Sequence, residues 1–204
     1  MLADTAARRG DERRALDSLQ SMHEIGLSRG LPRLAVASLL GQVRIHVMAA
    51  RVETAEEVLA SASALRPTFE HPDYRPFLRM LDKRLAVATA SVLLSRSDPE
   101  GADAVLRLSG EAPAALLCSP DVLVCRALRA LAAHQLARSN ARELLNEVVS
   151  LAELRGMRRI VAEAHPGLGA LIAPSRPAQG GDAASGVASR DDRSVRGNIA
   201  SPPE

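Results

Sequence analysis

Apolar residues recur along this chain at the spacing of an α-helix, up to about residue 172. They return every three or four positions, which places them on one face of a helix. No stretch alternates apolar and polar residues over the length of a strand, so we place no strand. The pattern predicts an all-α fold. The apolar stripes are Ala15, Leu16, Leu19 and Met22; Val36, Leu39, Leu40, Val43 and Val47; Ala55, Val58, Leu59, Ala62 and Leu65; Leu78, Leu81, Leu85, Ala88 and Val92; Val124, Leu128 and Leu131; and Ala141, Leu144, Leu145, Val148 and Ala152.

Residues that begin and end helices lie between these stripes. Asp98-Pro99 and Ser119-Pro120 each offer a capping side chain, followed by a proline at the first helical position, where its missing N–H costs nothing. Pro32 is placed in the same way. Gly110 and Gly156 follow apolar stripes and favour the left-handed residue that ends many helices.

Four segments repeat one pattern, in which a polar turn precedes an alanine and a leucine follows four residues later. Successive alanines are 40, 47 and 39 residues apart. A small residue lets a neighbouring helix approach closely, and the leucine lies one turn above it on the same face. Each helix pair would expose an apolar face that only the next pair can cover, so the pattern predicts a solenoid of tetratricopeptide-repeat (TPR)-like helix pairs. The anchors are Ala15 and Leu19, Ala55 and Leu59, Ala102 and Leu106, and Ala141 and Leu145.

The composition changes after residue 172. Pro, Gly, Ser and Ala dominate the rest, and the larger apolar residues there are Val187, Val195 and Ile199. Such a segment cannot bury enough apolar surface to offset the entropy lost on ordering it. We therefore expect a TPR-like helical-repeat domain over residues 1–172 and a disordered linker or tail over residues 173–204.

Composition supports the helical prediction and argues against several functional classes. Hydrophobic residues make up 47% of the chain, mostly Ala, Leu and Val, of which Ala and Leu favour helices. The 26 Lys and Arg nearly balance the 24 Asp and Glu, so the concentrated positive field that nucleic-acid binding needs is missing. The N-terminus lacks the apolar core of a signal peptide, and no uncharged run could span a membrane. These features predict a cytoplasmic protein without a membrane segment.

The sequence contains no motif for catalysis or metal binding. The phosphate-binding loop, HExxH, CxxC and GxSxG patterns are all absent. No two of the five histidines lie three or four residues apart, so no helix face presents a pair of metal ligands. Cys118 and Cys125 are expected to pack in the core as reduced side chains, and Gly167 to Gly169 to form a turn after His165-Pro166. We expect a binding protein without a cofactor rather than an enzyme.

Arginines on corresponding helices are the candidates for partner binding. Arg33 and Arg44 fall on the second helix of one pair, and Arg126 and Arg129 on the matching helix of a later pair. They could line a concave surface and bind an anionic ligand or an acidic peptide. The alternative is that they are solvated surface charges. We predict Arg44 and Arg129 as the residues that contact a partner.

The chain's three aromatic residues gather in one proline-rich stretch, where the longest spacing between repeats falls. They are Phe69, Tyr74 and Phe77. One interpretation is that they fill the junction between two repeats. The other is that they form a hydrophobic anchor for a partner.

Two long stretches resemble the helical-repeat region of the MalT-like branch of LuxR-family transcriptional regulators. They are RGDERRALDSLQSMHEIGLSRGLPRLAVASLLGQVRIHVMAARVETAEEVLA and ARELLNEVVSLAELRGMRRIVAEAHPGLGALI, within residues 9–172. The end of the second stretch resembles the family's final repeat, with a helix, Gly156, the pair Arg158-Arg159 and then the acidic and His-Pro element from Glu163 to Pro166. The resemblance implies a bacterial sensor arm that binds a small-molecule inducer or a regulatory protein.

The chain departs from this family's layout at both ends. The family implies an ATP-binding module before the arm and a helix-turn-helix after it, and this sequence shows neither motif. The resemblance therefore does not imply ATP binding for this chain. DNA would be contacted only through a helix-turn-helix absent from this chain. We expect a truncated, fragmentary or degenerate regulator; the alternative is a free-standing TPR-like scaffold unconnected to transcription. Self-association through a terminal helix face is compatible with both the regulator and the scaffold interpretation.

Overall fold

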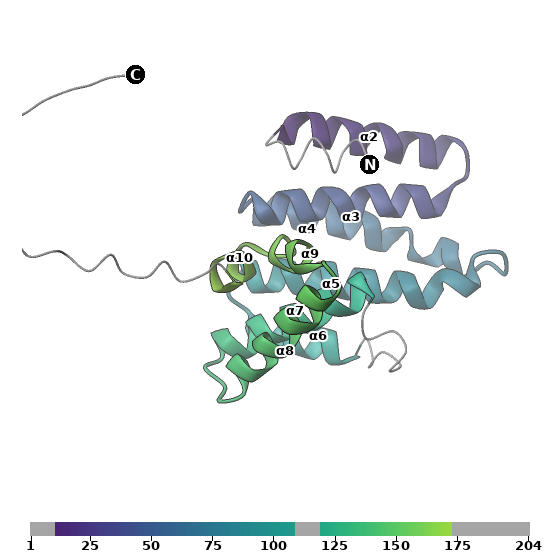
Figure 1. Cartoon of the computed structure of the whole chain (residues 1–204). Helices are drawn as coiled ribbons and strands as arrows, with labels where there is room; N and C mark the ends of the chain where they lie inside the picture. The colour runs from purple at the N-terminus through teal and green to yellow at the C-terminus, as the bar shows by residue number, and fades with distance from the viewer. Residues whose placement is uncertain (1–10, 109–118, 173–204) are drawn as a thin grey trace, which may run out of the picture. The chain divides into compact units, whose positions relative to one another are not determined.

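The computed structural model describes residues 11–108 and 119–172, all within the first of the two units into which the chain divides, Met1–Ala173 and Pro174–Glu204. Every regular element in these residues is a helix and none is a strand, which confirms the all-α prediction (Figure 1). The predicted disordered tail, Gly110 and Cys118 lie outside the described residues. The elements are α2 (Glu12–Ser28), α3 (Pro32–Met48), α4 (Val52–Ala64), the 3₁₀ helices η1 (Arg66–Glu70) and η2 (Arg75–Phe77), α5 (Leu78–Ser95), α6 (Pro99–Leu108), α7 (Pro120–Gln135), α8 (Ala141–Leu154), α9 (Arg158–Ala162) and α10 (Pro166–Ile172).

Besides contacts between successive helices, every second helix from α3 to α9 contacts the next in that series. Each helix from α2 to α9 contacts the next one along the chain, and in addition α3 packs against α5, α5 against α7, and α7 against α9. We call these four helices the inner row. Helices α2, α4, α6 and α8, the outer row, make no comparable contacts with one another in the part of the chain that the structure describes. Figure 1 shows α2, α3 and α5 in succession, with α7 and α8 running obliquely to them.

The repeated alanine and leucine anchors lie on the four outer-row helices. All four alanines are buried, and each lies in the first turn of its helix. Leu19 and Leu106 are buried as well, while Leu59 and Leu145 are partly buried. The prediction that these residues form packing faces is confirmed. The reason is local, because a small residue followed four positions later by a large one makes an apolar stripe on a helix wherever that helix packs.

Small residues also bring α2 and α3 into close contact. A β-carbon added at Gly26 would lie 2.6 Å from the backbone nitrogen of Ala35, so the two backbones touch there without an intervening side chain. A β-carbon added at Gly41 would lie 2.9 Å from the side chain of Leu19. Close packing of this pair therefore depends on glycine at two positions.

Five helices end in the same Schellman turn. In each, a residue with positive φ follows the helix, and the N–H of the next residue donates to a carbonyl five residues earlier, as Met157 does to Ala152 at 2.7 Å. The predicted glycine stop is confirmed at Gly156. Three of the turns use alanine or serine instead, in a conformation that disfavours any residue with a β-carbon. The positive-φ residues are Gly30, Ala50, Ser97, Ala137 and Gly156.

Exchanging the residues at two of these turns should change stability in opposite directions. Ala137→Gly should raise the free energy of unfolding by about 0.5–1 kcal/mol, because the strain of a left-handed alanine exceeds the extra chain entropy of glycine. Gly156→Ala should lower it by a similar amount, since a β-carbon there has open space around it and only the backbone is strained. Urea denaturation measures both. A change in the free energy of unfolding in the same direction for both variants would contradict this explanation.

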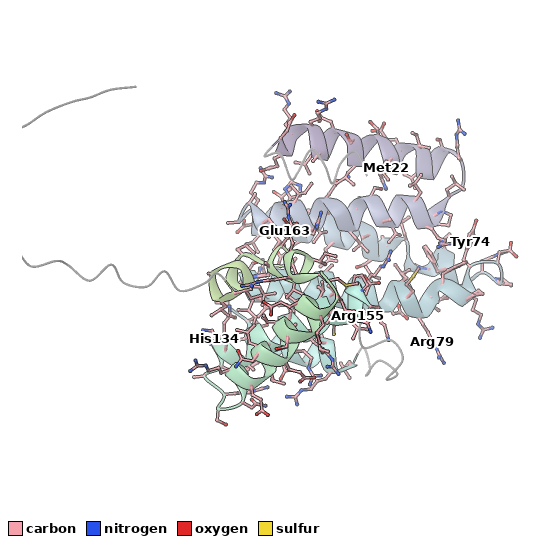
Figure 2. All side chains as sticks on the ribbon, viewed as in Figure 1. Met22, Tyr74, Arg79, His134, Arg155 and Glu163 are labelled. Carbon is pink, nitrogen blue, oxygen red and sulfur yellow. The ribbon has the colours of Figure 1, made fainter. Side chains whose placement is uncertain are left out.

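The aromatic residues lie at the junction between α4 and α5. Phe69, on η1, is buried with apolar side chains of α3, α4 and α5. The Tyr74 hydroxyl, labelled in Figure 2, donates to the backbone oxygen of Gly30 at 3.3 Å. Phe77 lies under the guanidinium of Arg33, which is 3.8 Å from the ring centroid. All three rings are engaged within the chain, which supports the junction interpretation over the anchor for a partner.

The predicted turn at Gly167 to Gly169 is wrong. These residues lie in α10, which begins at Pro166. Leu168 and Ile172 are buried in the core shared with α5 to α9, and this packing overrides the low helix propensity of the two glycines.

The predicted caps at Ser119 and Asp98 are confirmed. Each side chain accepts a hydrogen bond from the backbone N–H group three residues further along the chain. No helix within the described ranges combines the length and the apolar character needed to cross a membrane.

Candidate functional site

The two arginines predicted to contact a partner lie on inner-row helices. Arg44 is exposed on α3, and Arg129 is partly exposed on α7. Helix α5 packs against both of these helices. The Nε of Arg129 lies 3.8 Å from the Oδ1 of Asp103. The structure thus places Arg129 beside the carboxylate of Asp103 on α6, whereas Arg44 is exposed on a different helix.

The other two arginines singled out in the sequence are engaged within the chain. The Nη1 of Arg126 donates to the Oε1 of Glu147 on α8 at 2.7 Å. Arg33 stacks on the ring of Phe77. These contacts give both side chains a structural role, in line with the alternative that they are surface charges rather than ligand-binding residues.

Three arginines converge on one buried carboxylate. The Oδ2 of Asp103 accepts hydrogen bonds from the Nη2 of Arg107 at 2.7 Å and from the Nη1 of Arg138 at 2.6 Å, and Arg129 approaches its Oδ1. We call these four residues the arginine cluster. The Asp103 side chain is only 7% exposed, whereas those of Arg107, Arg129 and Arg138 are 58%, 38% and 40% exposed. The carboxylate is thus a buried floor beneath a solvent-facing rim of guanidinium groups.

Local structure explains how the arginine cluster is assembled. Asp103 follows the buried anchor Ala102 on α6, and Arg107 lies one turn later, at the i+4 position that favours an ion pair on a helix. Arg138 immediately follows Ala137, the positive-φ residue that turns the chain after α7. Its backbone N–H closes that turn. The turn therefore directs the side chain of Arg138 back towards α6.

The electrostatic environment keeps Asp103 ionised. Burial alone would raise the pKa of its carboxyl, but hydrogen bonds from Arg138 and Arg107, together with their positive charges, lower the pKa below its ordinary value of 3.8. At neutral pH the cluster therefore combines one negative charge with three positive charges. Such a site favours the binding of a further anion.

A second polar contact, between His165 and Ser95, links α10 to α5. The backbone N–H of Gly167 donates to His165 Nδ1 at 3.1 Å, so in the neutral ring Nε2 carries the proton and faces Ser95 Oγ, also at 3.1 Å. The Ser95 hydroxyl donates to the backbone oxygen of Ser91. A catalytic histidine must instead accept the serine proton at this nitrogen. The geometry therefore fits a structural link and not a nucleophile with its base.

Stability should fall as the pH drops below about 6.5, the ordinary pKa of histidine. Burial lowers the pKa of His165, so the unfolded chain takes up a proton at a higher pH than the folded one does. Burial and Arg51, partly opposed by Glu12, also lower the pKa of His46 and add to this loss. His165→Gln should flatten the dependence of the urea midpoint between pH 7 and pH 5, whereas His134→Gln, at the exposed end of α7 (Figure 2), should not. An unchanged slope in the His165 variant would contradict its assignment as a buried neutral histidine.

The arginine cluster is the site that the geometry defines best. Among residues 11–108 and 119–172, no three His, Cys, Asp or Glu side chains lie close enough together to hold a metal ion. Cys125 is partly buried against the core of α5 to α10, as expected for a packed side chain.

Comparisons of the chain with protein-family models, with curated proteins and with solved structures find no match in any of the three.

Proposed function

We propose that this chain is a TPR-like helical-repeat module that binds an effector or a regulatory protein, as the sensor arm of a MalT-like regulator of the LuxR family. The observation that carries the proposal is the inner row, in which α3, α5, α7 and α9 pack one against the next. A stack of helix pairs needs this contact between every second helix, because each pair covers the apolar face of the one before.

The arrangement of charge supports binding rather than catalysis. The arginine cluster joins α6, α7 and the turn that follows α7, so its residues come from one helix pair and from the turn that leads to the next pair. Its guanidinium groups offer hydrogen-bond donors to solvent, but the cluster contains no side chain suited to act as a nucleophile or as a general base near neutral pH. Recognition of an anionic group is the chemistry that such residues perform best.

The coding DNA next to this segment tests the connection to transcription. The proposal predicts a helix-turn-helix coding sequence after codon 204, in the same frame or a shifted one, in this locus or in related loci. A free-standing scaffold would have no such neighbour in any of them. If no helix-turn-helix coding sequence follows in any of these loci, the regulator assignment is refuted, while the proposal of a binding module stands.

The chain by itself should not bind DNA specifically. Its formal net charge is only +2, and several of its arginines are paired with acids, including Arg84 with Asp121 and Arg158 with Glu153. The positive field that DNA binding requires is therefore weak. Gel-shift assays at physiological salt, against fragments of the neighbouring intergenic DNA, should show no retarded species that resists competitor DNA. Specific binding in the nanomolar range would contradict the assignment of this segment to the arm.

A further inference from the structure

We propose that the arginine cluster binds a dianionic oxyanion of the phosphate class. The inference deepens the proposed function, on which it rests, by naming the chemical group that an effector or partner presents to this module. Three features of the cluster support it: the convergence of its arginines, its excess of positive charge, and the difference in exposure between the acid and the arginines.

The first feature is convergence. Arg107 and Arg138 donate to the same carboxylate oxygen, Oδ2 of Asp103, at 2.7 and 2.6 Å. Their guanidinium groups therefore lie close to each other, and Arg129 lies near the second oxygen of the same carboxylate. Because hydrogen bonds to Asp103 hold Arg107 and Arg138 in place, these two side chains lose less conformational entropy when a ligand binds them.

The second feature is the charge. One carboxylate faces three guanidinium groups, which leaves two positive charges in excess. No other acidic side chain pairs with these arginines within the described ranges. Like charges held this close repel one another, and a bound anion relieves the repulsion. A dianion cancels the excess in full, whereas a single carboxylate cancels half of it. The charge therefore favours a phosphate group over the carboxylate of an acidic peptide.

The third feature is exposure. The acid is almost wholly buried and its three arginines are 38–58% exposed, so a ligand arriving from solvent meets the arginines and not the carboxylate. Each guanidinium has five N–H donors in a planar fork. Binding Asp103 occupies a minority of them, and the rest match the oxygen spacing of a phosphate group.

Calorimetric titration of the full chain with inorganic phosphate at pH 8, where phosphate is mainly a dianion, tests the proposal. The ionic strength is held constant with chloride. Phosphate and sulfate should both bind saturably, and acetate, a monoanion, at least about tenfold more weakly. Equal affinity for acetate and phosphate, or no saturable phosphate binding, would overturn the proposal. Wild-type protein suffices for this comparison, so it does not depend on any variant folding.

Substitutions then locate the site. Arg129→Gln and Arg138→Gln should each weaken phosphate binding at least about tenfold. Each leaves Asp103 with two of its three arginines, and circular dichroism checks that both variants fold. The matched control is Arg126→Gln, which also removes an arginine from α7 but one that pairs with Glu147. It should leave the affinity unchanged. An equal loss in this control would show a response to overall charge and would overturn the assigned site.

Failure of the phosphate-site proposal can be distinguished from failure of the proposed function. A module that binds its effector without binding phosphate would refute the dianion site and leave the proposed function standing. Phosphate binding at the arginine cluster, in a chain whose loci lack any helix-turn-helix, would support the site and refute the regulator assignment.

Discussion

Replacing Leu128 with alanine should lower the free energy of unfolding by about 3 kcal/mol. Leu128 lies on α7 and is wholly buried in the core that α5 to α10 share. Removing its isopropyl group loses the transfer free energy of three carbons and leaves a cavity that five surrounding helices cannot easily close. Urea denaturation followed by circular dichroism at 222 nm measures the loss.

A second leucine provides the control. Leu154, at the end of α8, is 80% exposed, so Leu154→Ala should change stability by less than about 0.5 kcal/mol. Both substitutions remove the same three carbons from a leucine side chain on a helix, so the main difference between them is burial. A similar effect at the two positions would show that Leu128 is not buried as the structure describes.

Asp103→Asn should lower the free energy of unfolding by about 2 kcal/mol. The substitution keeps the shape of the side chain but removes the charge that holds three arginines, and charged hydrogen bonds are worth roughly twice as much as neutral ones. The loss is smaller than for a fully buried ion pair, because the arginines are partly exposed and solvent screens their charges. Urea denaturation at pH 7 gives the measurement.

Acid pH supplies an internal check on this variant. The pKa of Asp103 is lowered in the folded chain, so its stabilisation is present above the ordinary value of 3.8 and is lost as the pH falls through the folded pKa. The wild type and Asp103→Asn should therefore converge in stability in strong acid. Asp121→Asn, which removes an exposed partner 3.4 Å from Arg84, should cost little at any pH. A difference between wild type and Asp103→Asn that persists undiminished in strong acid would exclude the charge as its cause.

The features of the fold that could be predicted from the sequence are the local ones. Helical periodicity, the proline starts and the alanine and leucine anchors each depend on residues within a few positions of one another, and all are observed. Three of the helix ends escaped prediction, because Ala50, Ser97 and Ala137 adopt positive φ only where the packing of adjacent helices imposes the turn. Helix α10 escaped for a similar reason, since burial of Leu168 outweighs its glycines.

The candidate site was predictable only in part. Arg129 was identified by its place on a helix that matches an earlier one, but Asp103 and Arg138 were not, because 35 residues separate them and no local pattern links them. Arg107 follows Asp103 by four residues, and that i+4 spacing is a signal that the sequence does contain. A charged residue next to a buried anchor, as Asp103 is next to Ala102, is the further clue that could have drawn attention to the cluster.

Hydrogen exchange measured by mass spectrometry tests most directly whether the helix pairs act as stacked repeats. In such a stack each unit is stabilised by its neighbours, so opening free energies should differ along the chain. The inner helices α5 and α7, with neighbours on both sides, should exchange most slowly, and α2, which packs mainly on α3, should exchange fastest among the long helices. Uniform protection from α2 to α8, as in a single cooperative globule, would contradict the repeat architecture on which the proposed binding module rests.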